Sequence, residues 1–143
     1  MYIPKNGRIA IVDDQLKHAE PLMNILAQRQ LPYTYFSGDV NFLPSSDSQN
    51  NDIRILFLDI NLIDDSEHEN KVLKSKLVPV LKRIISKNNH PYVIIYWSRH
   101  EHHKELIEKE IFGIDLKERC PIGFLSASKS DFFNNDGSKT EDF

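Results

Sequence analysis

Ile53-Arg-Ile-Leu-Phe-Leu-Asp-Ile-Asn-Leu62 combines a short apolar run with an acid that closes it. Five of the six residues from Ile53 to Leu58 are apolar, which is typical of a strand buried on both faces of a parallel sheet. Asp59 follows directly, and in open α/β sheets ligands bind outside the carboxyl ends of the strands. A carboxylate there costs desolvation free energy unless a partner or a ligand uses it. Asp59 is therefore the first candidate functional residue.

Four other segments have the composition and length of short strands. They are residues 8–12, 33–36, 92–97 and 122–125. Helical spacing of apolar residues predicts helices between most of these strands, over residues 16–30, 66–87 and 102–112. The second helix is preceded by Ser66–Glu69, which fits a capping box, and Gly113 should end the third.

Two prolines fall inside the expected helices. Pro21 should either begin the first helix or kink it, and Pro79 should kink or split the second. Residues 37–52 are rich in Ser, Asn, Asp and Pro, so we expect a long loop where an α/β unit usually carries a second helix. The last helix, after the fifth strand, is only weakly indicated.

Strands that alternate with helices indicate a parallel sheet with right-handed crossovers and helices on both faces. The expected fold is therefore α/β, a doubly wound five-stranded parallel sheet. The length of 143 residues fits one domain, which we place at residues 1–130. Residues 131–143 are then a polar tail, or the start of a linker or of the last helix.

Composition argues against several classes of protein. Hydrophobic residues make up 40% of the chain and charged residues 27%, as in an ordinary soluble globular protein. The net charge of −3 gives no electrostatic case for direct binding of nucleic acid, and no apolar run approaches the length of a membrane span. The single cysteine, Cys120, excludes an internal disulfide framework, so a cytoplasmic location is expected.

Polar residues follow four of the expected strands at their carboxyl ends. They are Asp13–Asp14, Asp59, Ser98 and Lys129. Because these strand ends share one edge of a parallel sheet, the four groups can converge. Three carboxylates together raise one another's pKa unless a cation neutralises them, and Mg²⁺ prefers such oxygen ligands. With an ammonium and a hydroxyl group nearby, the pattern predicts a site that accepts a phosphoryl group.

The sequence resembles the receiver domain of bacterial two-component response regulators, as a divergent member. The matching motifs are Ile11-Val-Asp13-Asp14, Leu58-Asp59-Ile-Asn61-Leu62, Ser98 and Lys129, in family order over residues 8–130. The resemblance implies a flavodoxin-like sheet with the strand order 2-1-3-4-5. It also implies that Asp59 is the phosphoacceptor.

The resemblance gives the other site residues their roles. The ligands of Mg²⁺ would be Asp13, Asp14, Asp59 and the backbone carbonyl of Asn61. The groups that contact the phosphoryl oxygens would be Ser98 and Lys129. A histidine kinase or a phosphotransfer protein would be the donor, and an output domain or a downstream protein would respond. The chain would not be an enzyme, beyond catalysing its own phosphorylation and dephosphorylation.

The sequence departs from the family pattern at several positions. Ile63 and Ser130 stand where the family usually has proline, Arg99 replaces a small residue, and Ser126 replaces an aromatic residue. These departures favour an alternative, a pseudo-receiver that acts as an interaction module without phosphorylation. Simpler roles also remain open, because Asp13–Asp14 could cap the first helix and Asp59 could be a structural acid. A Mg²⁺-dependent phosphatase or nuclease is a third class, but the sequence lacks its usual nucleophile motifs.

Overall fold

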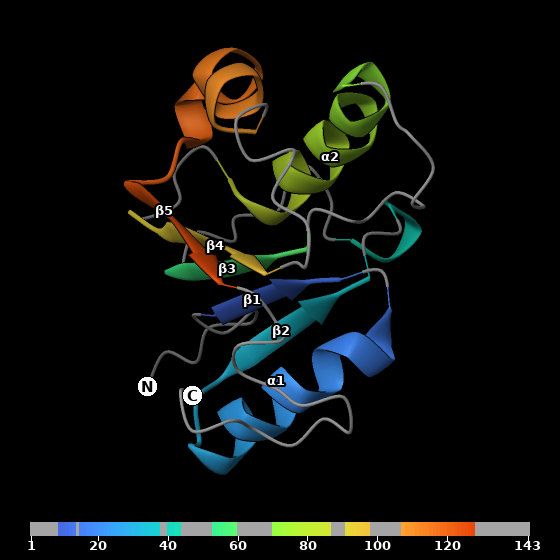
Figure 1. Ribbon diagram of the computed structural model, residues 1–143, viewed down its shortest axis with the longest axis vertical. Helices are drawn as coiled ribbons and strands as arrows, with labels where there is room; N and C mark the ends of the chain where they lie inside the picture. The colour runs from blue at the N-terminus through green and yellow to red at the C-terminus, as the bar shows by residue number, and fades with distance from the viewer. Residues whose placement is uncertain are drawn as a thin grey trace.

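A five-stranded sheet forms the centre of the computed structural model, which describes residues 9–13, 15–37, 40–43, 53–59, 70–86, 91–97 and 107–127. The strands are β1 (Ile9–Val12), β2 (Tyr33–Phe36), β3 (Ile55–Leu58), β4 (Val93–Trp97) and β5 (Gly123–Ala127). Every neighbouring pair is parallel, in the order β2-β1-β3-β4-β5 (Figure 1). The expected flavodoxin-like arrangement is confirmed.

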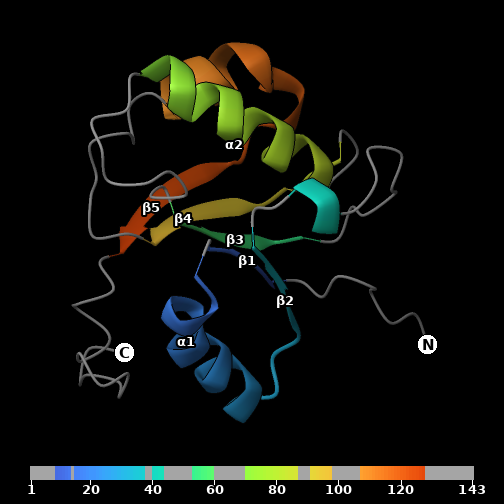
Figure 2. The same ribbon diagram turned by 90° about the vertical axis from the view of Figure 1, so that its right-hand side faces the viewer.

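Helical segments cover both faces of the sheet. They are α1 (Leu16–Gln28), the 3-10 turn η1 (Val40–Phe42), α2 (Asn70–Ile84), the π-helical η2 (Ile107–Asp115) and the 3-10 turn η3 (Lys117–Arg119). Helix α1 lies on one face, while α2 and η2 lie on the other (Figure 2). This division follows from right-handed crossovers. The connection from β1 to β2 leads toward one edge of the sheet, whereas the connections from β3 to β4 and β5 lead toward the other edge, so their helices lie on opposite faces.

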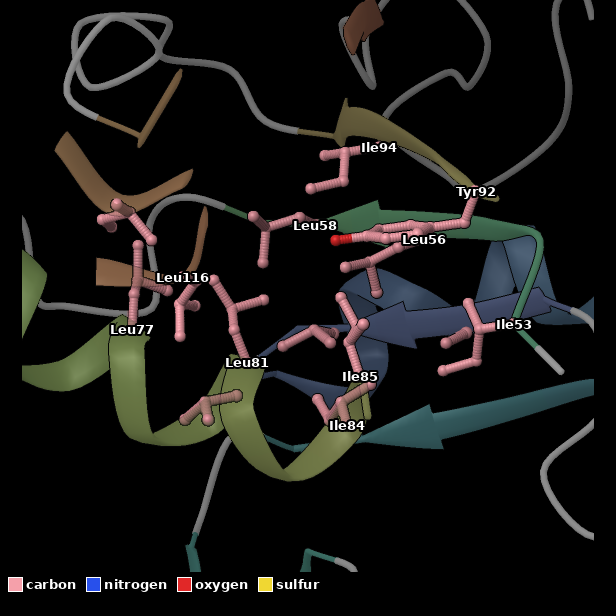
Figure 3. Close-up of a cluster of buried hydrophobic side chains, with 14 of the residues drawn as sticks. Ile53, Leu56, Leu58, Leu77, Leu81, Ile84, Ile85, Tyr92, Ile94 and Leu116 are labelled. Atoms are coloured by element: carbon pink, nitrogen blue, oxygen red, sulfur yellow. The ribbon is translucent and has the colours of Figure 1, made fainter. Parts of the chain in front are cut away.

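The larger core lies between the sheet and the α2–η2 layer. Figure 3 shows part of it, in which Leu77 and Leu81 of α2 lie against Leu56 and Leu58 of β3 and Ile94 of β4. All five side chains are fully buried. Alternate strand residues point to opposite faces, so the smaller core under α1 uses the other set. Its strand members are Ile9 and Ile11, with Tyr33, Tyr35, Ile55 and Phe57 packed around them.

Both prolines lie within continuous helices. Helix α1 begins at Leu16, so the expectation that Pro21 begins the helix is wrong. Helix α2 runs through Pro79 without a break, so the expected split is wrong as well. A helical proline removes one backbone hydrogen bond, whereas packing of an amphipathic face supplies most of the stability of a helix in a folded protein. In α2 that packing continues on both sides of Pro79, through Leu77 and Val80.

The segment before β5 differs from the predicted α-helix. Gly113 does not end it, because η2 continues to Asp115. The winding is π-helical, and the Leu116 N–H donates to the Ile111 carbonyl, five residues earlier, at 2.6 Å. Ile111, Phe112 and Leu116 are all buried, so packing on the sheet accompanies this wider turn. Where the described residues allow a comparison, the other strands and helices differ from the predicted ranges by at most two residues at their ends. The expected capping box at Ser66–Glu69 lies outside the described residues.

A hydrogen-bonded connection joins the ends of three elements near the start of β4. The Tyr92 hydroxyl donates to the Arg119 carbonyl, and Arg119 Nε donates to the Ile85 carbonyl at 2.9 Å. Ile85 directly follows α2, so the guanidinium group lies at the negative end of that helix, where a cation is stabilising.

Among the helices that the structure describes, none has the length and apolar character needed to cross a bilayer.

Helix α2 supplies a direct test of the core. We expect Leu81→Ala to lower the free energy of unfolding by about 2–5 kcal/mol, because it leaves a cavity in a fully buried site. Leu31→Ala is the matched control, since Leu31 is 43% exposed and should change the same quantity by less than about 1 kcal/mol. Urea denaturation measures both. Equal losses in the two variants would contradict the described packing of α2.

A second prediction concerns alkaline unfolding. Burial raises the pKa of the Tyr92 hydroxyl above its ordinary value of 10.0. The folded chain therefore holds this proton more tightly than the unfolded chain, and the resulting stability is present below pH 10 and lost as pH rises further. We expect the free energy of unfolding to fall less steeply above about pH 10 in Tyr92→Phe than in the wild type. Parallel slopes in urea titrations would contradict the burial of this hydroxyl.

Candidate functional site

Two acids from adjacent strands meet at the carboxyl edge of the sheet. The register pairs Val12 of β1 with Leu58 of β3, and Asp13 and Asp59 are the next residues on the two strands. The ladder extends to these positions, because the Asp59 N–H donates to the Val12 carbonyl at 2.9 Å. The acids are almost fully buried, with exposed fractions of 0% for Asp13 and 4% for Asp59. The sheet thus holds two carboxylates side by side.

Backbone and side-chain contacts fix Asp13 from three directions. Its N–H donates to the Phe36 carbonyl at 3.2 Å, and its own carbonyl accepts the Tyr35 hydroxyl at 2.6 Å. Its carboxylate oxygen Oδ1 accepts the Gln15 N–H at 3.0 Å. Strand β2 therefore fixes the backbone of Asp13, and the residue before α1 bonds its carboxylate.

The contact with Gln15 bears on the helix-capping interpretation. Gln15 is the N-cap residue of α1, and its side chain makes no capping bond. Asp13 thus lies before the cap and accepts a hydrogen bond from the amide of the cap residue, while Asp14 lies outside the described residues. This bond shapes the turn from β1 into α1. Asp13 therefore has a structural role at this turn.

Two neighbouring buried carboxylates repel each other and lose solvation, so the arrangement is favourable when a cation or hydrogen-bond donors compensate. Oxygen donors at a sheet edge fit a hard cation such as Mg²⁺, which needs few protein ligands because it retains several waters. Within the described residues, no group of three or more His, Cys, Asp or Glu side chains comes together. Asp13 and Asp59 are therefore the part of the predicted metal site that the described structure brings together.

The remaining predicted site residues lie outside the described ranges. They are Asp14, Asn61, Ser98 and Lys129. Chain connectivity still relates two of them to the edge. Trp97 and Ala127 are register partners at the ends of β4 and β5, and Ser98 is one residue beyond the first while Lys129 is two residues beyond the second.

An aromatic cluster lies between β4, β5 and η2. The rings of Tyr96 and Phe124 are stacked, with centroids 5.9 Å apart and an interplanar angle of 6°. Phe112 packs against Phe124 with the same centroid distance and a tilt of 54°. Burial raises the pKa of Tyr96, so its hydroxyl stays protonated well above neutral pH. Ser126, at the position where the resemblance to receiver domains leads us to expect an aromatic residue, is an exposed residue of β5.

Sequence reasoning identified Asp13 and Asp59 but missed the contribution of Tyr35. The residue is one of three aromatics in Tyr33-Thr-Tyr-Phe36, and nothing in that run marks one hydroxyl as functional. Its role depends on the register that pairs Ile11 with Tyr35, which directs the ring toward the end of β1. One signal could have suggested this role of Tyr35. It is a tyrosine on a strand that neighbours a strand ending in Asp.

Comparisons with known proteins add little to this geometry. No protein-family model matches the sequence, and no curated protein matches it significantly. The chain is similar to a solved structure described as an adenylate cyclase from Rhodopirellula baltica. The identity is 17%, the match covers 85% of this chain and 76% of that one, and the TM-score is 0.40.

Removing the hydroxyl oxygen of Tyr35 tests whether this residue helps to position Asp13. We expect Tyr35→Phe to lower the free energy of unfolding by about 0.5–1.5 kcal/mol, because a part-buried hydrogen bond is lost. It should also weaken any Mg²⁺ binding in an isothermal titration. Tyr33→Phe removes the same atom from the other end of β2 and serves as the control. If both variants behave alike, Tyr35 has no special part in positioning Asp13.

Proposed function

We propose that this chain is a signal-transduction receiver domain that accepts a phosphoryl group on Asp59 in a Mg²⁺-dependent reaction. The observation that carries the proposal is the burial of Asp13 and Asp59 on adjacent strand ends of a 2-1-3-4-5 parallel sheet. Charged groups are rarely buried without a function or a partner. The sequence motifs around both acids, and their order along the chain, support the same proposal.

In this proposal the carboxylates have two roles, binding of Mg²⁺ and attack on phosphorus. Asp13, Asp14, Asp59 and the backbone carbonyl of Asn61 would hold the ion. When bound, Mg²⁺ supplies positive charge that offsets the repulsion between the carboxylates and an incoming phosphoryl group. A carboxylate oxygen of Asp59 attacks phosphorus, the bond from phosphorus to the donor's histidine nitrogen breaks, and that nitrogen leaves with the electron pair. Ser98 and Lys129 would then contact the phosphoryl oxygens.

The partners follow from this chemistry. The donor would be a histidine kinase or a phosphotransfer protein, and the response would be a changed protein–protein interaction, with an attached output domain or a separate downstream protein. The reaction is stoichiometric, since one phosphoryl group is accepted per chain and later lost by hydrolysis. Turnover of a diffusible substrate is not part of the proposal.

One observation favours the second candidate, an interaction domain that works without phosphorylation. Phe124, the aromatic residue of β5, is stacked on Tyr96 and packed against Phe112. Ser126 occupies the position closer to the edge. Packing in this cluster would oppose a change in the orientation of the Phe124 ring in response to events at Asp59. This candidate keeps the acid pair for structure or for a metal ion.

Acetyl phosphate labelling separates the two candidates. With Mg²⁺, we expect the mass of the wild type to rise by one phosphoryl group, and Asp59→Asn to abolish the change because the attacking carboxylate is lost. Asp115→Asn is the matched control, since Asp115 is an exposed acid of η2, and it should label like the wild type.

Two other results are informative. Mg²⁺ binding without labelling of the wild type would sink the receiver proposal and support the interaction domain. Equal labelling of the wild type and Asp59→Asn would place the modification on another residue.

A further inference from the structure

Helix η2 is an unusually long π-helical segment. It extends over nine residues, Ile107–Asp115, whereas π-helical winding mostly occupies a single turn inside an α-helix. The bond from the Leu116 N–H to the Ile111 carbonyl continues the five-residue spacing past its last residue. π-Helical turns are frequent at functional sites, so the winding of η2 is a candidate for a conformational role.

The π winding determines which apolar residues of η2 face the sheet. Ile111, Phe112 and Leu116 are at most 1% exposed, and the Phe112 ring packs against the Phe124 ring of β5. Ile114, in contrast, is 69% exposed. The packed face is therefore made by two residues that are five apart and by the neighbour of one of them, while a large isoleucine remains in solvent.

The sequence of η2 also contains the apolar pattern of an α-helix. Ile107, Ile111 and Ile114 are spaced at i, i+4 and i+7, which places residues on one face of an α-helix. At about 100° per residue, Ile114 would lie within about 20° of Ile107 around the helix axis, whereas Phe112 would lie about 140° from it. The same nine residues thus have a different apolar face for each winding.

We propose that η2 exchanges between the π winding and an α winding in which Ile114 replaces Phe112 against the sheet. In the α winding the Leu116 N–H would bond the Phe112 carbonyl, four residues earlier, in place of the Ile111 carbonyl. The buried apolar area then changes only by the difference between a phenylalanine and an isoleucine side chain. Backbone hydrogen bonds are exchanged rather than lost, so neither contribution separates the two windings by much.

Gly113 is placed where the change in winding must occur. It is exposed and lies between Phe112 and Ile114, the two residues that exchange. A Cβ at this position would come no nearer than 3.5 Å to the Glu108 carbonyl oxygen, which is an ordinary contact, so packing does not require glycine. Glycine does weaken the interior of a helix through its conformational freedom, and it therefore lowers the cost of rewinding at this point.

The exchange is a conformational switch that does not depend on the proposed phosphoryl transfer. The π winding keeps Phe112 against Phe124, which is stacked on Tyr96 of β4, whereas the α winding would remove the first of these contacts. It would also change the apolar side chain that η2 presents to solvent from Ile114 to Phe112. A partner that binds one of these two surfaces would select one winding.

Nuclear magnetic resonance of the full chain tests the exchange. In the wild type we expect contacts between the Phe112 and Phe124 rings, together with microsecond-to-millisecond exchange at residues 107–116 from the minor α winding. Ile114→Ser should lower the population of the α winding about tenfold or more, because that winding would then bury a serine. Ile122→Ser is the matched control, since Ile122 is 73% exposed outside η2 and should leave the exchange unchanged.

A second variant shifts the equilibrium in the opposite direction. Phe112→Ser removes the ring that the π winding buries, so we expect the Ile114 methyl groups to contact the Phe124 ring. Unchanged exchange in Ile114→Ser would overturn the proposal, and so would a wild type without exchange combined with no Ile114 contact in Phe112→Ser. If Phe112→Ser fails to fold, absence of exchange in the wild type overturns it alone.

Discussion

The pairing of β1 with β3 is the contact on which the candidate site depends. Each strand is short and apolar, and the register that aligns Val12 with Leu58 also aligns the two acids that follow them. Placing two carboxylates together in a buried position is unfavourable by itself. Burial of the apolar residues of the same strands, such as Ala10 and Leu56, supplies the free energy that offsets this cost. Because the acids directly follow these strands, the packing of the strands also fixes the positions of the acids.

The same edge is organised by contacts that come from outside these two strands. Tyr35 reaches from β2 to the backbone of Asp13, and the Gln15 amide bonds its carboxylate from the start of α1. A charged acceptor bonded to a backbone amide has a well-defined position. Asp13 is consequently bonded both by β2 and by the residue before α1, and the Asp59 N–H bonds the end of β1.

Packing, rather than local propensity, decides how the helices are built. Pro21 and Pro79 lie inside helices, and Gly113 lies inside η2. A Cβ at Gly113 would come no nearer than 3.5 Å to the Glu108 carbonyl oxygen, so no steric need for glycine exists there. The buried residues on either side of these positions keep the chain helical, because each helix is stabilised by the face that it presents to the sheet.

The sequence by itself determined the order of strands and helices, the parallel sheet, and the two acids at strand ends. These features are local, since apolar runs and the residues that close them are adjacent in the chain. Only the tertiary structure decided the contact of Tyr35 with Asp13, the π-helical winding of η2, and the exposure of Leu125. Each of these depends on register or on the cover of a face, which involves residues far apart in sequence. Strand periodicity tells which side chains share a face, but what packs on that face is settled by the assembled fold.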